Sequence, residues 1–120
     1  MNLEEFIKTQ LESVDDLRGL LLFHSNPQTE WDSTSLAVKL YIQPAAAAAV
    51  LARMAAKKFL IAEGQPVRYH FQPESPELAQ LVKELAELDR QRPVTLINMI
   101  YARPEDLQAF ADAFKIKKEN

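Results

Sequence analysis

The sequence predicts an α+β domain that is mainly helical, and two observations support this fold class. Apolar residues recur every three or four positions over most of the chain, which is the spacing of amphipathic helices. Two short extended runs, 59–62 and 67–71, flank the turn Glu63-Gly64-Gln65-Pro66 and predict one β-hairpin. With 120 residues, of which 48% are hydrophobic, the chain is long enough to bury one core. We therefore expect a single domain over residues 1–120.

Two helices are predicted at the N-terminus. Asn2 followed three residues later by Glu5 has the form of a capping box, and the apolar spacing after it predicts a helix over 3–12. Ser13 is a second start signal, and the apolar stripe behind it predicts a helix over about 14–24. A Ser-Asn-Pro turn then ends this helix.

The second half of the chain predicts four more helices. Pro44 stands at the position that helices prefer for proline, and the alanine-rich run behind it predicts a helix over 44–57. A strong apolar stripe predicts another over 76–91, and 94–101 is predicted as a short buried helix. An amphipathic helix is expected from Pro104 onwards.

Two segments, 36–42 and 94–101, are compatible with either a helix or a strand. Apolar residues alternate over 36–42 as they do in a strand, but Leu36 and Leu40 also share one helical face behind a suitable N-cap, Asp32 or Ser33. If both segments are strands, the chain is an alternating α/β domain with strands at 36–42, 67–71 and 94–101. If both are helices, the fold is mainly helical with one hairpin.

The order helix, short strand, helix, turn, helix and hairpin over residues 14–71 resembles the winged helix-turn-helix module of small bacterial transcriptional regulators. Apolar positions and the Gln43-Pro44 start of the third helix carry the resemblance: Leu36, Ala37, Leu40, Ile42, Val50, Leu51 and Met54. Such modules favour glycine at two turn positions that Tyr41 and Lys58 occupy here. The resemblance implies a winged-helix core at 14–72, a helical extension at 73–120, and a DNA-binding regulator of transcription in a bacterium.

Charge is distributed unevenly along the chain, although the net charge is only −3. Residues 1–34 carry seven acids against two bases, a net charge of −5, whereas residues 35–70 carry five bases against one acid, a net charge of +4. We expect the bases of this middle segment to contact the phosphates of duplex DNA, with an affinity that falls as salt rises. They are Lys39, Arg53, Lys57, Lys58 and Arg68.

The helix over 44–57 also supports an alternative function, that of a protein-protein interaction module that does not bind DNA. At 100° per residue, its apolar core face is Ala47, Val50, Leu51 and Met54, and its opposite face is Ala45, Ala49, Ala52 and Ala56. Methyl groups cannot make the bidentate hydrogen bonds that distinguish bases, but they let another helix approach closely. A second apolar surface, Leu107, Phe110 and Phe114 in the C-terminal helices, predicts a homodimer for the DNA-binding regulator and, for the interaction module, contact with a signalling protein.

The sequence contains no pattern typical of an enzyme, a metal site or a cofactor site. There is no cysteine, and the two histidines, His24 and His70, belong to different predicted elements. Two glycines cannot form a phosphate-binding loop, and no serine has the setting of a nucleophile. We therefore expect no catalytic residue, no metal and no cofactor. The acidic N-terminus and the absence of a long apolar run predict a cytoplasmic protein that does not insert into membranes.

Overall fold

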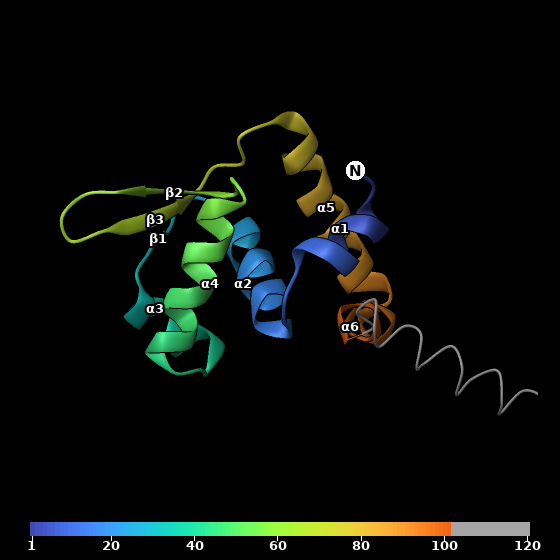
Figure 1. Cartoon of the computed structure of the whole chain (residues 1–120), viewed down its shortest axis with the longest axis horizontal. Helices are drawn as coiled ribbons and strands as arrows, with labels where there is room; N and C mark the ends of the chain where they lie inside the picture. The colour runs from blue at the N-terminus through green and yellow to red at the C-terminus, as the bar shows by residue number, and fades with distance from the viewer. Residues whose placement is uncertain (102–120) are drawn as a thin grey trace, which may run out of the picture.

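The computed structural model describes residues 1–101, in which helices predominate and one small sheet forms (Figure 1). The elements in chain order are α1 (Leu3–Gln10), α2 (Val14–Ser25), β1 (Glu30–Trp31), α3 (Ser33–Leu40), α4 (Pro44–Ala56), β2 (Leu60–Glu63), β3 (Arg68–Phe71), α5 (Pro76–Gln91) and α6 (Pro93–Tyr101). This is an α+β winged-helix fold, as the sequence predicted. The expected helix from Pro104, with Leu107, Phe110 and Phe114, lies outside the described residues.

The first two helices begin at the predicted capping residues. Asn2 Oδ1 accepts a hydrogen bond from the Glu5 N–H at 2.8 Å, and Ser13 Oγ accepts one from the Asp16 N–H at 3.2 Å. Each cap satisfies a backbone N–H that the helix itself leaves unpaired. The predicted bounds of these helices are therefore correct to within two residues.

Residues 33–40 form a helix, so the strand reading of 36–42 is wrong. Asp32 caps this helix by accepting from the Ser35 N–H at 2.8 Å, while Ser35 Oγ accepts from the Asp32 N–H at 3.0 Å. This reciprocal capping box fixes a helical start, and Leu36 and Leu40 then share the buried face. Since 93–101 is also helical, the alternative α/β domain is excluded.

Tyr41 and Lys58 adopt the left-handed backbone conformation for which related modules use glycine. Their φ angles are 58° and 73°. After α4, the Lys58 N–H donates to the Ala55 carbonyl at 3.1 Å, and the Phe59 N–H donates to the Met54 carbonyl at 3.0 Å. These two bonds form a Schellman motif, which closes the C-terminus of the helix and requires a positive φ at Lys58. The turn geometry is therefore kept even though both side chains carry a Cβ atom, at a cost of about 1 kcal/mol each.

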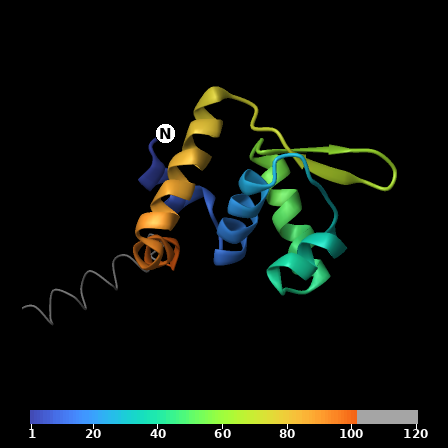
Figure 2. The ribbon, with the colours of Figure 1, turned by 180° about the vertical axis from the view of Figure 1, so that it is seen from behind.

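The hairpin of β2 and β3 forms the wing, and β1 completes an antiparallel sheet of order β1-β3-β2. β2 and β3 pair from Leu60 opposite Phe71 to Glu63 opposite Arg68, and the turn between them contains Gly64 with a φ of 86°. The wing extends from the body of the molecule on the side away from α5 and α6 (Figures 1 and 2).

α2 and α4 pack closely because Gly19 lacks a side chain. A Cβ atom at Gly19 would lie 2.9 Å from Val50 Cγ1 of α4, which is closer than carbon atoms approach. Around this contact, α2 buries Leu17, Leu20 and Phe23 in the core. The position of α4 is thus set by direct contact with the middle of α2.

Phe59 belongs to the core and not to the wing, where the prediction had placed it. Its side chain is 1% exposed, and its ring meets that of Phe6 edge-on with centroids 5.5 Å apart. β2 begins one residue later, at Leu60. The base of the wing is therefore attached to α1, which in turn packs against α5 and α6.

Within residues 1–101, no single helix is long and apolar enough to cross a membrane. α3 and α4 reach that length and hydropathy only when taken together, and they are bent by 108° at the turn between them.

Candidate nucleic-acid interface

α4 buries the face that the helical spacing predicted and presents small side chains on the other. Ala47, Val50, Leu51 and Met54 are 0–1% exposed. Of the predicted outer face, Ala45, Ala52 and Ala56 are exposed and Ala49 is half-buried. The exposed part of this helix therefore consists largely of methyl groups.

Gln43 is a polar side chain beside this surface that the sequence analysis did not identify. It is exposed at the N-cap of α4, and its side chain makes no capping hydrogen bond. The residue types preferred at a helix N-cap do not include glutamine. A glutamine at the N-cap of α4 is therefore a sequence signal that could have identified this side chain as a candidate for binding. A free amide is one of the groups that can pair with the edge of adenine in the major groove.

Two of the five predicted phosphate-binding residues lie exposed on segments that adjoin α4. Lys58 is exposed in the turn directly after the helix. Arg68 starts the second strand of the wing; its side chain is 49% exposed, and its Nη1 lies 3.7 Å from Asp32 Oδ2. An exposed pair at this distance is weak, so the guanidinium can exchange the carboxylate for a phosphate.

Lys39 is also exposed, but it lies beside α2. Its side chain lines a hollow of about 320 Å³ together with Leu22, Asn26 and Trp31. This lysine of α3 thus lies beside α2 and β1.

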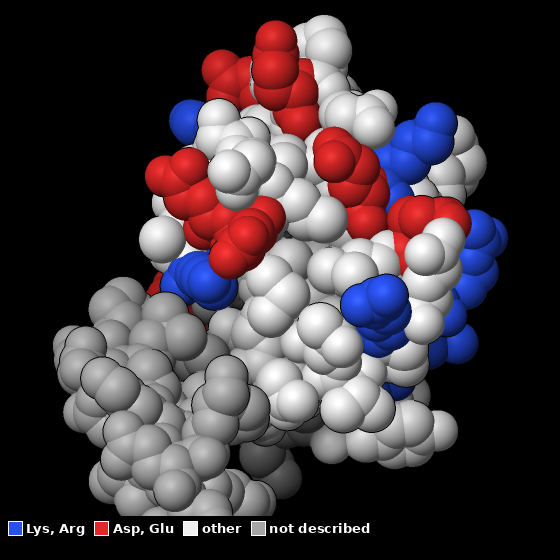
Figure 3. Space-filling model, turned by 90° about the vertical axis from the view of Figure 1, so that its right-hand side faces the viewer, with Lys and Arg blue, Asp and Glu red and all other residues white. Residues whose placement is uncertain are grey.

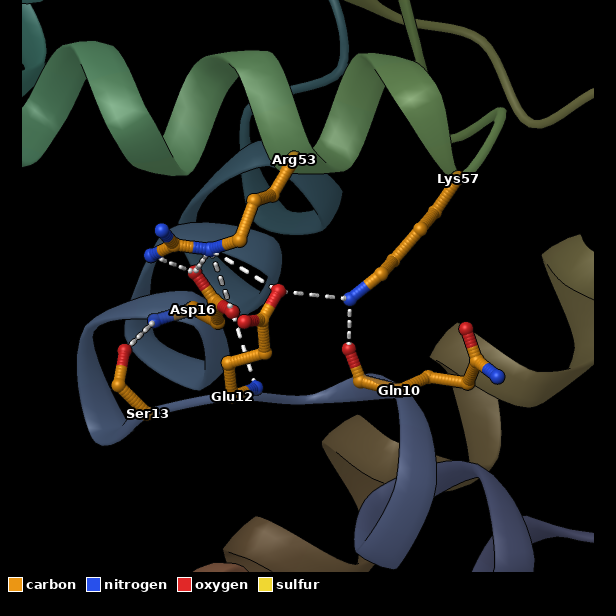
Figure 4. A network of polar contacts seen from close by, with 6 residues as sticks. All are labelled: Gln10, Glu12, Ser13, Asp16, Arg53 and Lys57. Atoms are coloured by element: carbon orange, nitrogen blue, oxygen red, sulfur yellow. Dashed lines mark hydrogen bonds and ion pairs between the residues drawn. The ribbon is translucent and has the colours of Figure 1, made fainter.

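The remaining two cations, Arg53 and Lys57, extend from α4 into a polar network with the end of α1 and the start of α2 (Figure 4). Arg53 Nε lies 3.0 and 3.1 Å from the two carboxylate oxygens of Asp16, and Arg53 Nη2 lies 2.7 Å from Asp16 Oδ1. Lys57 Nζ donates to the Gln10 carbonyl and lies 3.4 Å from Glu12 Oε2. The structure brings these two cations together with acids and not with Lys58 or Arg68.

Asp16 is the one charged residue that is wholly buried in the described part of the chain. Besides Arg53, its carboxylate accepts the Glu12 N–H at 3.0 Å. The hydrogen bond with Asp16 raises the pKa of Arg53 above its usual value, although partial burial acts in the opposite direction. Arg53 therefore remains a full positive charge at any pH at which the protein is folded.

Acidic side chains gather on a different face of the molecule. Figure 3 shows that they cover the upper part of the side formed by α1 and α5, while Lys and Arg lie mainly towards one edge. The acids of these helices include Glu4, Glu5, Glu77 and Glu84. The side formed by α1 and α5 is therefore rich in negative charge, which disfavours the approach of a polyanion from that side.

The two histidines lie on different elements, His24 on α2 and His70 on β3 of the wing. The His24 ring meets the Phe71 ring edge-on, with the ring centroids 6.1 Å apart. His70 Nε2 lies 3.2 Å from Gln72 Oε1 and 3.5 Å from Glu63 Oε1. Among residues 1–101, no three His, Asp or Glu side chains are grouped so that they could hold a metal ion.

Known structures share this fold at low sequence identity. No family model and no curated protein matches the sequence. A double mutant of ZitR from Lactococcus lactis is similar with a TM-score of 0.54 and 15% identity, over 89% of this chain and 73% of that one. Rv1404 from Mycobacterium tuberculosis is similar with a TM-score of 0.51 and 17% identity, over 98% of this chain and 83% of that one. At these identities the likeness shows the winged-helix fold, in which α4 stands as the third helix of the module and β2 and β3 as its wing.

Proposed function

We propose that the protein is a DNA-binding regulator whose winged helix contacts duplex phosphates through Lys58 and Arg68. The observation that carries this proposal is the exposure of both cations on the segments next to α4, the turn after it and the wing. In a winged helix of this kind the third helix enters the major groove. Its methyl face allows close approach, and the flanking cations bind the backbone on either side. Lys39 is a further candidate for a phosphate contact.

Binding of this kind is expected to be electrostatic and to depend weakly on base sequence. Alanine methyl groups offer apolar contacts to thymine but no hydrogen bonds, so most of the affinity comes from phosphates. Gln43 is the one exposed amide at the start of α4 and is the candidate for a base contact.

Replacing Lys58 and Arg68 with glutamine should weaken binding to a random-sequence duplex. Log affinity falls linearly with log salt, and each lost phosphate contact makes this negative slope shallower by about 0.9. The slope of the double variant should therefore be shallower by about 1.8. Fluorescence anisotropy of a labelled duplex, titrated at several salt concentrations, measures both quantities. Lys83→Gln is the matched control, because Lys83 is exposed on α5, away from α4 and the wing. Absence of binding by the wild-type protein even at low salt contradicts the proposed function.

The proposed DNA-binding form is a homodimer joined through the helices at the C-terminal end of the described chain. α6 buries Leu96 and Ile100 but exposes Val94, Ile97 and Tyr101, which recur at positions i, i+3 and i+7 and so share one face. An exposed apolar face of this kind suits association with a second copy. Two copies related by a two-fold axis would contact two half-sites of a duplex.

Replacing Val94 and Ile97 with glutamate should convert the dimer to a monomer, because both charges would have to be buried against the partner. Light scattering at micromolar concentration is expected to give the mass of two chains for the wild type and of one for the variant. The control is Ala79→Glu together with Gln80→Glu, which adds the same charges at exposed positions near the N-terminal end of α5. A wild-type mass of one chain excludes the dimer.

A second candidate function is docking of a protein on the exposed face of α4. The observation that favours it is the apolar surface on α4, in the preceding turn and on α3. Tyr41 of the turn is 91% exposed and Val38 of α3 67%, and Ala45, Ala52 and Ala56 of α4 are exposed. The duplex titration distinguishes the two candidates, since a docking module has no reason to bind DNA in a salt-dependent way. If no duplex binds, glutamate at Ala49 and Ala52 is the variant with which to test a protein partner.

A further inference from the structure

Asp16, Glu12 and the Gln10 carbonyl hold two cations of α4 that the charge pattern alone would assign to DNA. Both carboxylate oxygens of Asp16 lie within 3.1 Å of Arg53 nitrogens, and Arg53 Nε lies 3.6 Å from Glu12 Oε2. The side chains of Arg53 and Lys57 are only 30% and 21% exposed. Their charged groups point towards Asp16, Glu12 and Gln10, at the start of α2 and the end of α1 (Figure 4).

We infer that Arg53 and Lys57 are positioning residues, which fix α4 against α1 and α2 and thereby support DNA binding without contacting phosphate. This inference rests on the proposed function. For Arg53 to reach a phosphate, it would have to leave Asp16, whose side chain is 0% exposed. A buried carboxylate without a cation is strongly unfavourable, so the ion pair persists when DNA binds.

The same network links α4 to the helices proposed for dimerisation. Gln10 is the last residue of α1, and Glu12 lies in the connection between α1 and α2. α1 packs directly against α5 and α6. Through Lys57, the network therefore connects α4 to the end of α1 as well as to the start of α2.

Two variants distinguish a positioning role from a phosphate contact. Asp16→Asn removes a negative charge and releases Arg53, so a phosphate contact predicts tighter binding. A positioning role predicts binding that is about tenfold weaker, with an unchanged salt slope. Arg53→Lys retains the charge but loses the two-pronged geometry that matches a carboxylate. We expect it also to weaken binding at an unchanged slope, whereas a phosphate contact would tolerate lysine.

These variants are to be measured by duplex anisotropy in parallel with Lys58→Gln, for which the salt slope should become shallower by about 0.9. Tighter binding by Asp16→Asn, or wild-type affinity of Arg53→Lys, overturns the inference.

Hydrogen exchange of the same variants provides a reading that does not involve DNA. Asp16→Asn should speed amide exchange in residues 10–16 and in α4, while α5 keeps its wild-type protection. Equal acceleration over the whole chain would indicate a general loss of stability and contradict a positioning role. If the wild type binds no duplex, the proposed function fails by itself, and the exchange pattern still decides whether the network fixes α4.

Discussion

Arg53→Met is expected to destabilise the fold by about 3–5 kcal/mol, the cost of leaving a buried carboxylate without its cation. Asp16 is fully buried, so its charge has no access to water once Arg53 is removed. Methionine keeps most of the apolar volume of the arginine stem, so the loss is electrostatic and not one of packing. Urea unfolding followed by circular dichroism measures the effect as a change in the free energy of unfolding.

The reverse change and the double change test this explanation. Asp16→Asn should cost less than Arg53→Met, because the Arg53 side chain is 30% exposed and can be rehydrated. Asp16→Leu combined with Arg53→Met should recover much of the loss, since apolar pairs often replace buried ion pairs without penalty. A cost below about 1 kcal/mol for Arg53→Met would show that the pair behaves as an exposed one.

Phe59→Ala is expected to cost about 3–5 kcal/mol, as is typical of removing a fully buried aromatic ring. Phe59 is 1% exposed and contacts Phe6 edge-on, an arrangement that adds about 0.5–1.5 kcal/mol to the burial of its area. The cavity would open between α1 and the base of the wing. Since small domains are stable by only about 5–15 kcal/mol, much of the margin would be lost.

Phe59→Leu serves as the control, because it keeps most of the buried volume and should cost much less than alanine. Thermal unfolding of the three proteins should rank wild type above Phe59→Leu and Phe59→Leu above Phe59→Ala. If alanine and leucine are equally tolerated, Phe59 is not the contact that attaches the wing to α1.

Local sequence signals were sufficient to predict most of the described helices and the single hairpin. Caps at Asn2 and Ser13 marked helix starts, and the 100° spacing identified the buried face of α4 without any tertiary information. Between residues 36 and 42 the local signals conflicted, because an alternating run also fits a short helix. The capping box of Asp32 and Ser35 resolved this, and its second half could be recognised only from the observed hydrogen bonds.

Which cations of the basic segment remain exposed depends on tertiary packing. Arg53 and Lys58 are five positions apart in a basic segment and look equivalent in the sequence, yet Arg53 pairs with a carboxylate 37 positions earlier while Lys58 remains exposed. The same holds for Gly19, whose missing side chain matters because Val50 of another helix lies against it. A periodic pattern records which face of a helix is buried, but it does not record which residue of a distant helix lies opposite. The partners of buried charges and the sites of close helix contact therefore depend on the packing of α1, α2 and α4.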